Sequence, residues 1–135
     1  MALLVPDVGE VRLLSYALNK LVPENQILKL FTNNVTPAEG DVAGTFTEAT
    51  FTGYVAITLT GANWTVATVT GVTTGSQAQQ TFASTANQAT QLVYGYYVVG
   101  ATSGILLWAE RFTDGPYAIA VNGDQILITP KITGE

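Results

Sequence analysis

Two apolar segments joined by a short glycine-bounded turn constrain the fold more than any other feature of the sequence. Residues 91–99 read QLVYGYYVV and residues 105–112 read ILLWAERF, with GATSG between them. Segments rich in β-branched and aromatic residues, joined by a short loop that contains glycine, predict a β-hairpin. Both faces of the first segment are apolar, which predicts a central strand covered by a second sheet or by a neighbouring subunit.

Shorter strand patterns recur along the rest of the chain, separated by turn residues. Strands are predicted over residues 26–33, 54–60, 64–70, 77–84, 118–121 and 125–132. Residues 45–52 fit an edge strand or an ordered loop, whereas segment 71–76 (GVTTGS) predicts a flexible loop. Pro130 has no N–H group to donate, so the last strand is expected to lie at an edge or to leave the sheet there.

Short strands with turn signals roughly every 8–12 residues are typical of sandwiches and barrels. We therefore expect an all-β fold: an antiparallel two-sheet β-sandwich, jelly-roll-like, with one short N-terminal helix. An immunoglobulin-like sandwich is the nearest alternative. The 135 residues fit one domain. We divide them into an N-terminal arm and helix over residues 1–25 and a single β-sandwich over residues 26–135.

One helix is predicted, over residues 7–21. Asp7 is a suitable N-cap, Glu10 would complete a capping box, and Pro23 would end the helix. The apolar residues of this segment form one stripe, which consists of Val11, Leu14, Leu18 and Leu21. Two interpretations stay open: a helix that docks onto a partner, and a helix that packs on the sheet of its own domain.

The sequence contains no cysteine and no histidine. Disulfides, thiolate nucleophiles and Ser-His-Asp or Cys-His catalysis are therefore excluded. No serine stands in an S-x-x-K spacing, and the chain has no phosphate-binding loop ending in Gly-Lys. We expect a non-enzymatic protein without a cofactor.

Acidic residues in turns are the remaining candidates for a metal or catalytic site. Asp41 follows a glycine, Asp114 lies in a D-G-P turn and Asp124 in an N-G-D turn. Aspartate is common in turns because its side chain accepts hydrogen bonds from nearby backbone N–H groups. Turn formation is thus the favoured interpretation and no metal site is expected. A calcium ion between subunits is the alternative.

Charge is scarce and mostly negative, which bears on the partners. Charged residues make up 11% of the chain, the net charge is −5, and the five basic residues are dispersed. Nucleic acids and anionic membranes attract clustered lysine and arginine, so neither is expected as a partner. Low charge together with a mean hydropathy of +0.29 instead favours a surface buried between subunits, since interface cores are depleted in charge.

Aromatic residues concentrate in the predicted hairpin, where the run Tyr94-Gly-Tyr96-Tyr97 favours contact with a neighbouring subunit. Glu110 and Arg111 are adjacent, so they point to opposite faces, and whichever faces inward needs a partner. A salt bridge to a neighbouring subunit and exposure at a sheet edge are both possible. The residues expected at an oligomer or capsid interface are Tyr94, Tyr96, Tyr97, Trp108, Arg111, Leu14 and Leu18. The alternative is an exposed aromatic platform that stacks on sugar rings, built from Trp64, Tyr96 or Trp108.

Three segments resemble small structural proteins of tailed bacteriophages. They are residues 36–66 (TPAEGDVAGTFTEATFTGYVAITLTGANWTV), 93–112 (VYGYYVVGATSGILLWAERF) and 114–132 (DGPYAIAVNGDQILITPKI). The resemblance implies a virion component, either a head-decoration (cement) protein or another accessory head or tail protein. Such proteins are commonly β-rich and often trimeric. The resemblance assigns no active-site residues.

The resemblance leads us to expect a capsid decoration protein. Such a protein would bind the assembled phage head as a homotrimer, with the major capsid protein as its partner, and would stabilise the state that it binds. It would be in the host cytoplasm before assembly and on the capsid surface in the virion. The alternative is a carbohydrate- or host-surface-binding module of a phage tail or fibre.

Overall fold

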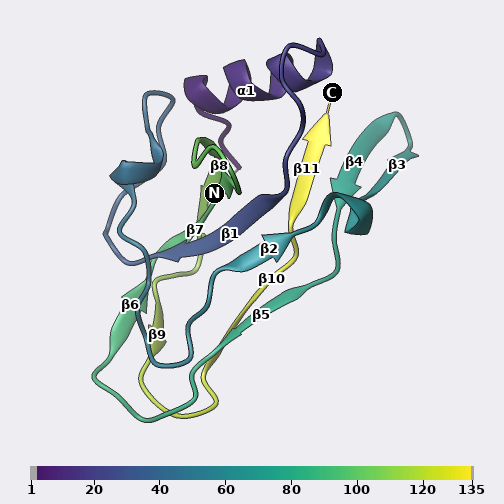
Figure 1. Cartoon of the computed structure of the whole chain (residues 1–135). Coiled ribbons are helices and arrows are strands. Elements are labelled where there is room, and N and C mark those ends of the chain that lie inside the picture. Colours follow the sequence, from purple (N-terminus) through teal and green to yellow (C-terminus); the bar gives the residue numbers. More distant parts are fainter. Residues whose placement is uncertain (1–2, 135) are drawn as a thin grey trace.

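The computed structural model describes residues 3–134 and shows an all-β antiparallel sandwich with one short N-terminal helix, as expected (Figure 1). The helix α1 spans Asp7–Ala17, and two single-turn 3₁₀ helices span Ala43–Thr45 and Gly61–Asn63. The strands are β1 (Gln26–Phe31), β2 (Ile57–Leu59), β3 (Thr65–Val69), β4 (Val72–Ser76), β5 (Gln80–Ala83), β6 (Gln91–Val93), β7 (Gly95–Gly100), β8 (Leu106–Arg111), β9 (Tyr117–Ile119), β10 (Gln125–Ile128) and β11 (Lys131–Gly134).

The second half of the chain forms one long antiparallel ribbon that folds back on itself. β4 pairs with β11, β5 with β10, β6 with β9 and β7 with β8. The pairing is therefore nested about the predicted hairpin, which is confirmed as β7–β8. This nesting agrees with the jelly-roll-like expectation. β1 adds to the free side of β7, giving a sheet in the order β2-β1-β7-β8.

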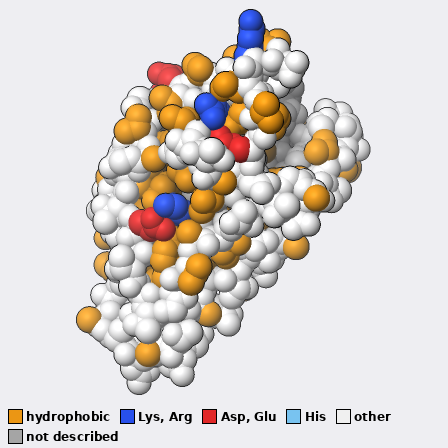
Figure 2. Space-filling view, in the orientation of Figure 1, with side chains coloured by type: hydrophobic (Ala, Val, Ile, Leu, Met, Phe, Trp, Pro, Cys, Tyr) orange, Lys and Arg blue, Asp and Glu red, His pale blue; other side chains and the backbone are white. Residues whose placement is uncertain are grey.

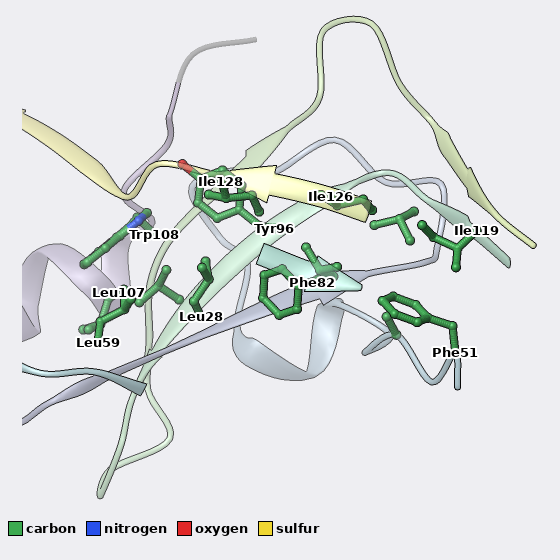
Figure 3. Close-up of a cluster of buried hydrophobic side chains, with 14 residues drawn as sticks. Leu28, Phe51, Leu59, Phe82, Tyr96, Leu107, Trp108, Ile119, Ile126 and Ile128 are labelled. Atoms are coloured by element: carbon green, nitrogen blue, oxygen red, sulfur yellow. The ribbon is translucent and has the colours of Figure 1, made fainter. Parts of the chain in front are cut away.

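Side chains of this single chain cover both faces of the central strand β7. On one face Val98 and Tyr96 join the larger hydrophobic cluster, which also receives side chains from β5, β9 and β10 (Figure 3). On the other face Tyr97 stacks on Phe46, with ring centroids 5.1 Å apart, and Phe31 packs against both rings. The two-sided burial predicted from the sequence is thus achieved within one chain, by a second layer and by the segment around Phe46.

The helix is shorter than predicted at its C-terminal end. Asn19 adopts a left-handed conformation with φ of 55°, and its N–H group donates to the carbonyl of Tyr16. The N–H of Lys20 donates to the carbonyl of Ser15, which completes a Schellman motif and ends the helix. At the other end the N-cap is Pro6, and the Asp7 side chain makes no capping hydrogen bond. The predicted capping box at Asp7 is therefore wrong.

Two further predictions need correction. Residues 71–76, expected as a loop, form β4, because this segment pairs with β3 on one side and with β11 on the other. The strand predicted over 54–60 is reduced to β2. Residues 45–52 form no named strand, which agrees with the ordered loop that the sequence left open. The last strand does leave its sheet at Pro130, where the chain passes from β10, paired with β5, to β11, paired with β4.

Candidate interaction surface

The N-terminal segment is attached to the sandwich along β8. Leu4 and Ala109 exchange two backbone hydrogen bonds, each 2.9 Å long. In the first turn of α1, Gly9 lies so close to β8 that a Cβ atom on it would approach the Leu107 carbonyl oxygen to 2.3 Å. A glycine at this position lets the helix backbone reach the strand without a side chain between them. This contact fixes which face of α1 points away from the sandwich.

Only part of the predicted apolar stripe lies on α1 itself: Val11 and Leu14 are on its outward face, Leu18 is its C-cap residue, and Leu21 follows beyond its end. Leu14 and Leu18 are 62% and 68% exposed, and Val11 and Leu21 are exposed as well. An apolar cavity of about 330 Å³ borders this stripe, and its lining includes Val8, Leu21 and Ile105. Figure 2 shows hydrophobic side chains in the region of the helix, at the top of the view, among others spread over the same face. Of the two interpretations left open by the sequence, packing on the domain's own sheet is observed for the helix, which lies on β8 through Gly9. The apolar stripe takes no part in that packing and stays exposed.

Glu24 holds the end of the N-terminal segment against the tip of the β7–β8 hairpin. Its carboxylate accepts hydrogen bonds from the Ser103 N–H at 2.9 Å, from the neighbouring Thr102 N–H, and from the Tyr16 hydroxyl at 2.7 Å. Arg12 forms a 2.9 Å ion pair with it. Partial burial alone would raise the pKa of Glu24, but the hydrogen bonds from Ser103, Tyr16 and the backbone outweigh it and hold the pKa well below its usual value. α1 is therefore fixed at both ends.

A second exposed feature is the arm, defined here as the three-stranded sheet β11-β4-β3, which projects from the sandwich beside α1 (Figure 1). All five residues of β3 are exposed. Between the arm and α1 runs a groove lined by Leu13, Val66 and Ile132, with Trp64 and Trp108 among its lining residues. The two indole rings meet edge to face at 6.2 Å, and the Trp64 Nε1–H donates to Gln26 Oε1 at 3.0 Å.

Three of the expected interface residues lie inside the chain's own core. Tyr96 is 5%, Tyr97 4% and Trp108 2% exposed. The structure therefore corrects their expected place at an interface, because no neighbouring subunit is needed to cover them. The sugar-stacking alternative loses two of its three rings for the same reason, since Tyr96 and Trp108 are not accessible from solvent.

Arg111 and Tyr94 contact each other within the chain, so the charge of Arg111 is not left without a partner at the surface. The Arg111 guanidinium donates to the Val35 carbonyl at 2.8 Å and to Asn34 Oδ1 at 2.7 Å. It also lies over the Tyr94 ring, 5.1 Å from the centroid. Arg111 thus has partners within its own chain, and Leu14 and Leu18 are the expected interface residues that remain fully on the surface.

The acidic turn residues act as turn formers in this structure. The Asp124 carboxylate accepts hydrogen bonds from the N–H groups of Val121 and Ala120, which lower its pKa. Asp41 accepts from the Ala38 N–H. Within residues 3–134, no group of three or more acidic side chains is close enough together to hold a metal ion.

The arm was not predicted from the sequence, although one signal for it is present. Between Glu48 and Glu110 the sequence has no charged residue, and this uncharged run includes β3 and β4. The glycines and threonines of 71–76 are typical of a loop, and this composition concealed the second strand of the hairpin. The overlooked surface is adjacent to α1, so both exposed apolar features lie on neighbouring parts of the molecule.

Comparison with known proteins provides no family for this chain. No family model matches the sequence, and no curated protein matches it either. Across residues 3–134, no helix combines the length and the apolar character needed to cross a membrane.

Proposed function

We propose that this chain is a non-enzymatic structural protein of a tailed-phage virion, a decoration protein that attaches to the assembled head through the outward face of α1. The supporting observation is the apolar stripe of Leu14 and Leu18, which is exposed although the helix that bears it is fixed to the sandwich through Gly9 and Glu24. The sequence resemblance over residues 36–66, 93–112 and 114–132 supplies the virion context. The major capsid protein is the proposed partner, and a homotrimer on the head surface is the assembly that the resemblance implies.

The physical basis of such attachment is burial of the stripe on a preordered helix. Fully burying a leucine side chain contributes about 1.5–3 kcal/mol. A helix that is already fixed loses little conformational freedom on binding, so more of this free energy appears as affinity. Binding the assembled shell in preference to its dissociated subunits shifts the equilibrium toward the shell. Many equivalent sites on one particle make modest individual contacts effective.

The proposal is tested with heads of the phage whose genome encodes the chain, prepared without this protein. The double variant L14S/L18S should bind these heads more than about tenfold more weakly than the wild type in co-sedimentation, because two buried leucines are lost. V55S is the matched control, since Val55 is similarly exposed but lies away from α1. It should bind like the wild type.

Both variants should unfold at the same denaturant concentration as the wild type, because the changed side chains are on the surface. Wild-type binding by L14S/L18S would show that the stripe is not the attachment surface. Absence of the wild-type protein from purified virions, measured by mass spectrometry, would contradict the virion role itself. Point substitutions are preferable to removal of residues 1–25, because that removal would also expose the Leu107 and Ala109 backbone on β8.

A further inference from the structure

The strand β3 is a sheet edge without protection. It is the outer strand of the arm, its five residues are exposed, and its ladder with β4 runs without a register shift. Its sequence, TVATV, has high β-propensity and contains neither charge nor proline. Natural proteins usually protect such edges with charged residues, proline, bulges or a covering segment.

Three other sheet edges among residues 3–134 carry such protection. The edge at β8 is covered by the N-terminal segment, through the backbone hydrogen bonds between Leu4 and Ala109. β11, the opposite edge of the arm, begins with Lys131 directly after Pro130. β2 is only three residues long. The strands of the two-stranded sheets β10-β5 and β6-β9 also lack charge and proline, but each has at most four residues and at least one of them is buried. β3 has five residues and all are exposed, so it is the edge best suited to pair with another strand.

The hydrogen-bonding groups that β3 offers follow from its hairpin turn. Thr70 and Gly71 have φ of 50° and 81°, the pattern of a two-residue type I′ turn, which makes the flanking residues Val69 and Val72 a hydrogen-bonded pair. Hydrogen-bonded and non-hydrogen-bonded pairs alternate along an antiparallel ladder. The backbone N–H and C=O groups of Val66 and Thr68 therefore point away from β4, toward the open edge.

We propose that β3 pairs with β3 of a second copy of this chain, antiparallel and about a two-fold axis at Ala67. In this register Val66 of one copy lies opposite Thr68 of the other, and the outward N–H and C=O groups of both residues find partners. Centring the axis on Ala67 pairs the whole of β3, whereas any other self-register leaves part of it unpaired. The two three-stranded arms then form one continuous six-stranded sheet.

The charge distribution favours a second copy as the occupant. A molecule with a net charge of −5 repels its own copies, and this repulsion is smallest where the contact surface is free of charge. The hairpin of β3 and β4 carries no charged residue. Side chains also match, because pairing across the axis places Thr and Val opposite each other, both of which suit a pleated sheet. This inference concerns the free protein in solution, whereas the homotrimer of the virion proposal is an assembly on the head surface. The two are independent, and the test of this inference needs no phage particle.

The absence of native cysteine makes the register directly testable by disulfide formation. In A67C the two introduced thiols would face each other across the axis in a non-hydrogen-bonded pair, with Cα atoms about 4.5 Å apart, which is within disulfide range. T68C is the matched control on the same strand, because the two Thr68 positions lie diagonally beyond that range. Under mild oxidation A67C should become a disulfide-linked dimer, while T68C remains largely unlinked.

A second measurement is the solution mass by size-exclusion chromatography with light scattering. The wild type should have the mass of two chains of 14.2 kDa, and the variant V66K/T68K should be a monomer with unchanged circular dichroism. A wild-type monomer at all concentrations would overturn the inference. Equal crosslinking of A67C and T68C would also overturn the inference. If the protein were then found to be a trimer, the decoration proposal would stand, but the trimer would not be formed by the β3 contact.

Discussion

Gly9 brings the backbone of α1 against Leu107 of the sandwich, so closely that a Cβ atom on Gly9 would lie only 2.3 Å from the Leu107 carbonyl oxygen. Glycine within a helix normally costs about 1 kcal/mol relative to alanine. Here that cost is offset, because the helix can lie directly on the backbone of β8. The contact also decides that the apolar stripe of α1 faces solvent.

G9A should therefore destabilise the protein, although alanine is the better helix former. The added methyl group forces α1 away from β8, and overpacking of this kind costs about 1–3 kcal/mol. The free energy of unfolding in urea measures the effect. The control is G40A, because a Cβ at Gly40 meets nothing within 4 Å. A G9A variant as stable as G40A would contradict the seating of α1 on β8.

Glu24 should make the free energy of unfolding depend on pH in the acidic range. Burial opposes ionisation of this carboxyl, but its hydrogen bonds to Ser103, Tyr16 and Thr102 outweigh burial and hold its folded-state pKa below the ordinary value of 4.5. A depressed carboxyl pKa contributes stability that is present above about pH 4.5 and lost as pH falls below it. The free energy of unfolding should thus decline below that pH in the wild type, and less steeply in E24Q.

At pH 7 the same E24Q variant should already be less stable than the wild type, because an amide can no longer form the ion pair with Arg12. A variant with the same slope as the wild type between pH 5 and pH 3 would show that other groups carry the acid dependence. Asp124, whose pKa is also lowered, is the first of these to examine, by the variant D124N.

Two adjacent tyrosines should respond differently to removal of their hydroxyl groups. The Tyr96 hydroxyl donates to Glu110 Oε2 at 2.7 Å, so Y96F should cost about 1.5–3 kcal/mol, the range for a hydrogen bond to a charged group. For Tyr97 the structure shows no such bond among residues 3–134, so Y97F should be close to neutral at pH 7. Urea denaturation of the two variants gives the comparison, and equal losses would contradict it.

Tyr97 should in turn contribute to loss of stability in alkali. Burial, with a smaller contribution from the charge of Glu48, raises the pKa of Tyr97 from 10.0 to about 12. The unfolded chain therefore releases this proton first, and stability falls as pH rises above 10. Y97F should show a shallower decline than the wild type between pH 10 and pH 11. An identical decline would show that Tyr97 is not held in its neutral form by the fold.

Thr70 offers a stabilising substitution. It has φ of 50° at the first central position of the β3–β4 turn, a conformation that disfavours β-branched residues and suits asparagine. T70N should stabilise the hairpin by about 1 kcal/mol. Hydrogen exchange of the β3 and β4 amides reports this local stability. T68N, on the extended part of the same hairpin, should show no gain.

The elements predicted well are those that local sequence signals define. The hairpin β7–β8, strand β1, and the break at Pro130 follow from apolar runs and from the missing proline N–H, and all three are observed. The fold class follows from the same signals. β4 was not predicted, because GVTTGS has the composition of a loop and becomes a strand only by pairing with two partners distant from each other in sequence.

The candidate surface, too, was predicted in part from local sequence signals and in part decided by tertiary packing. The sequence by itself determined that α1 has an apolar stripe and that β7 is apolar on both faces, because both are periodicities of consecutive residues. Only the tertiary structure decided that the stripe faces solvent while Tyr96, Tyr97 and Trp108 face inward. The physical reason is that exposure depends on what packs against a face. Here that packing is determined by two contacts between residues far apart in the chain. One is the close approach of the Gly9 backbone to β8, and the other is the nested series of strand pairs from β4–β11 to β7–β8.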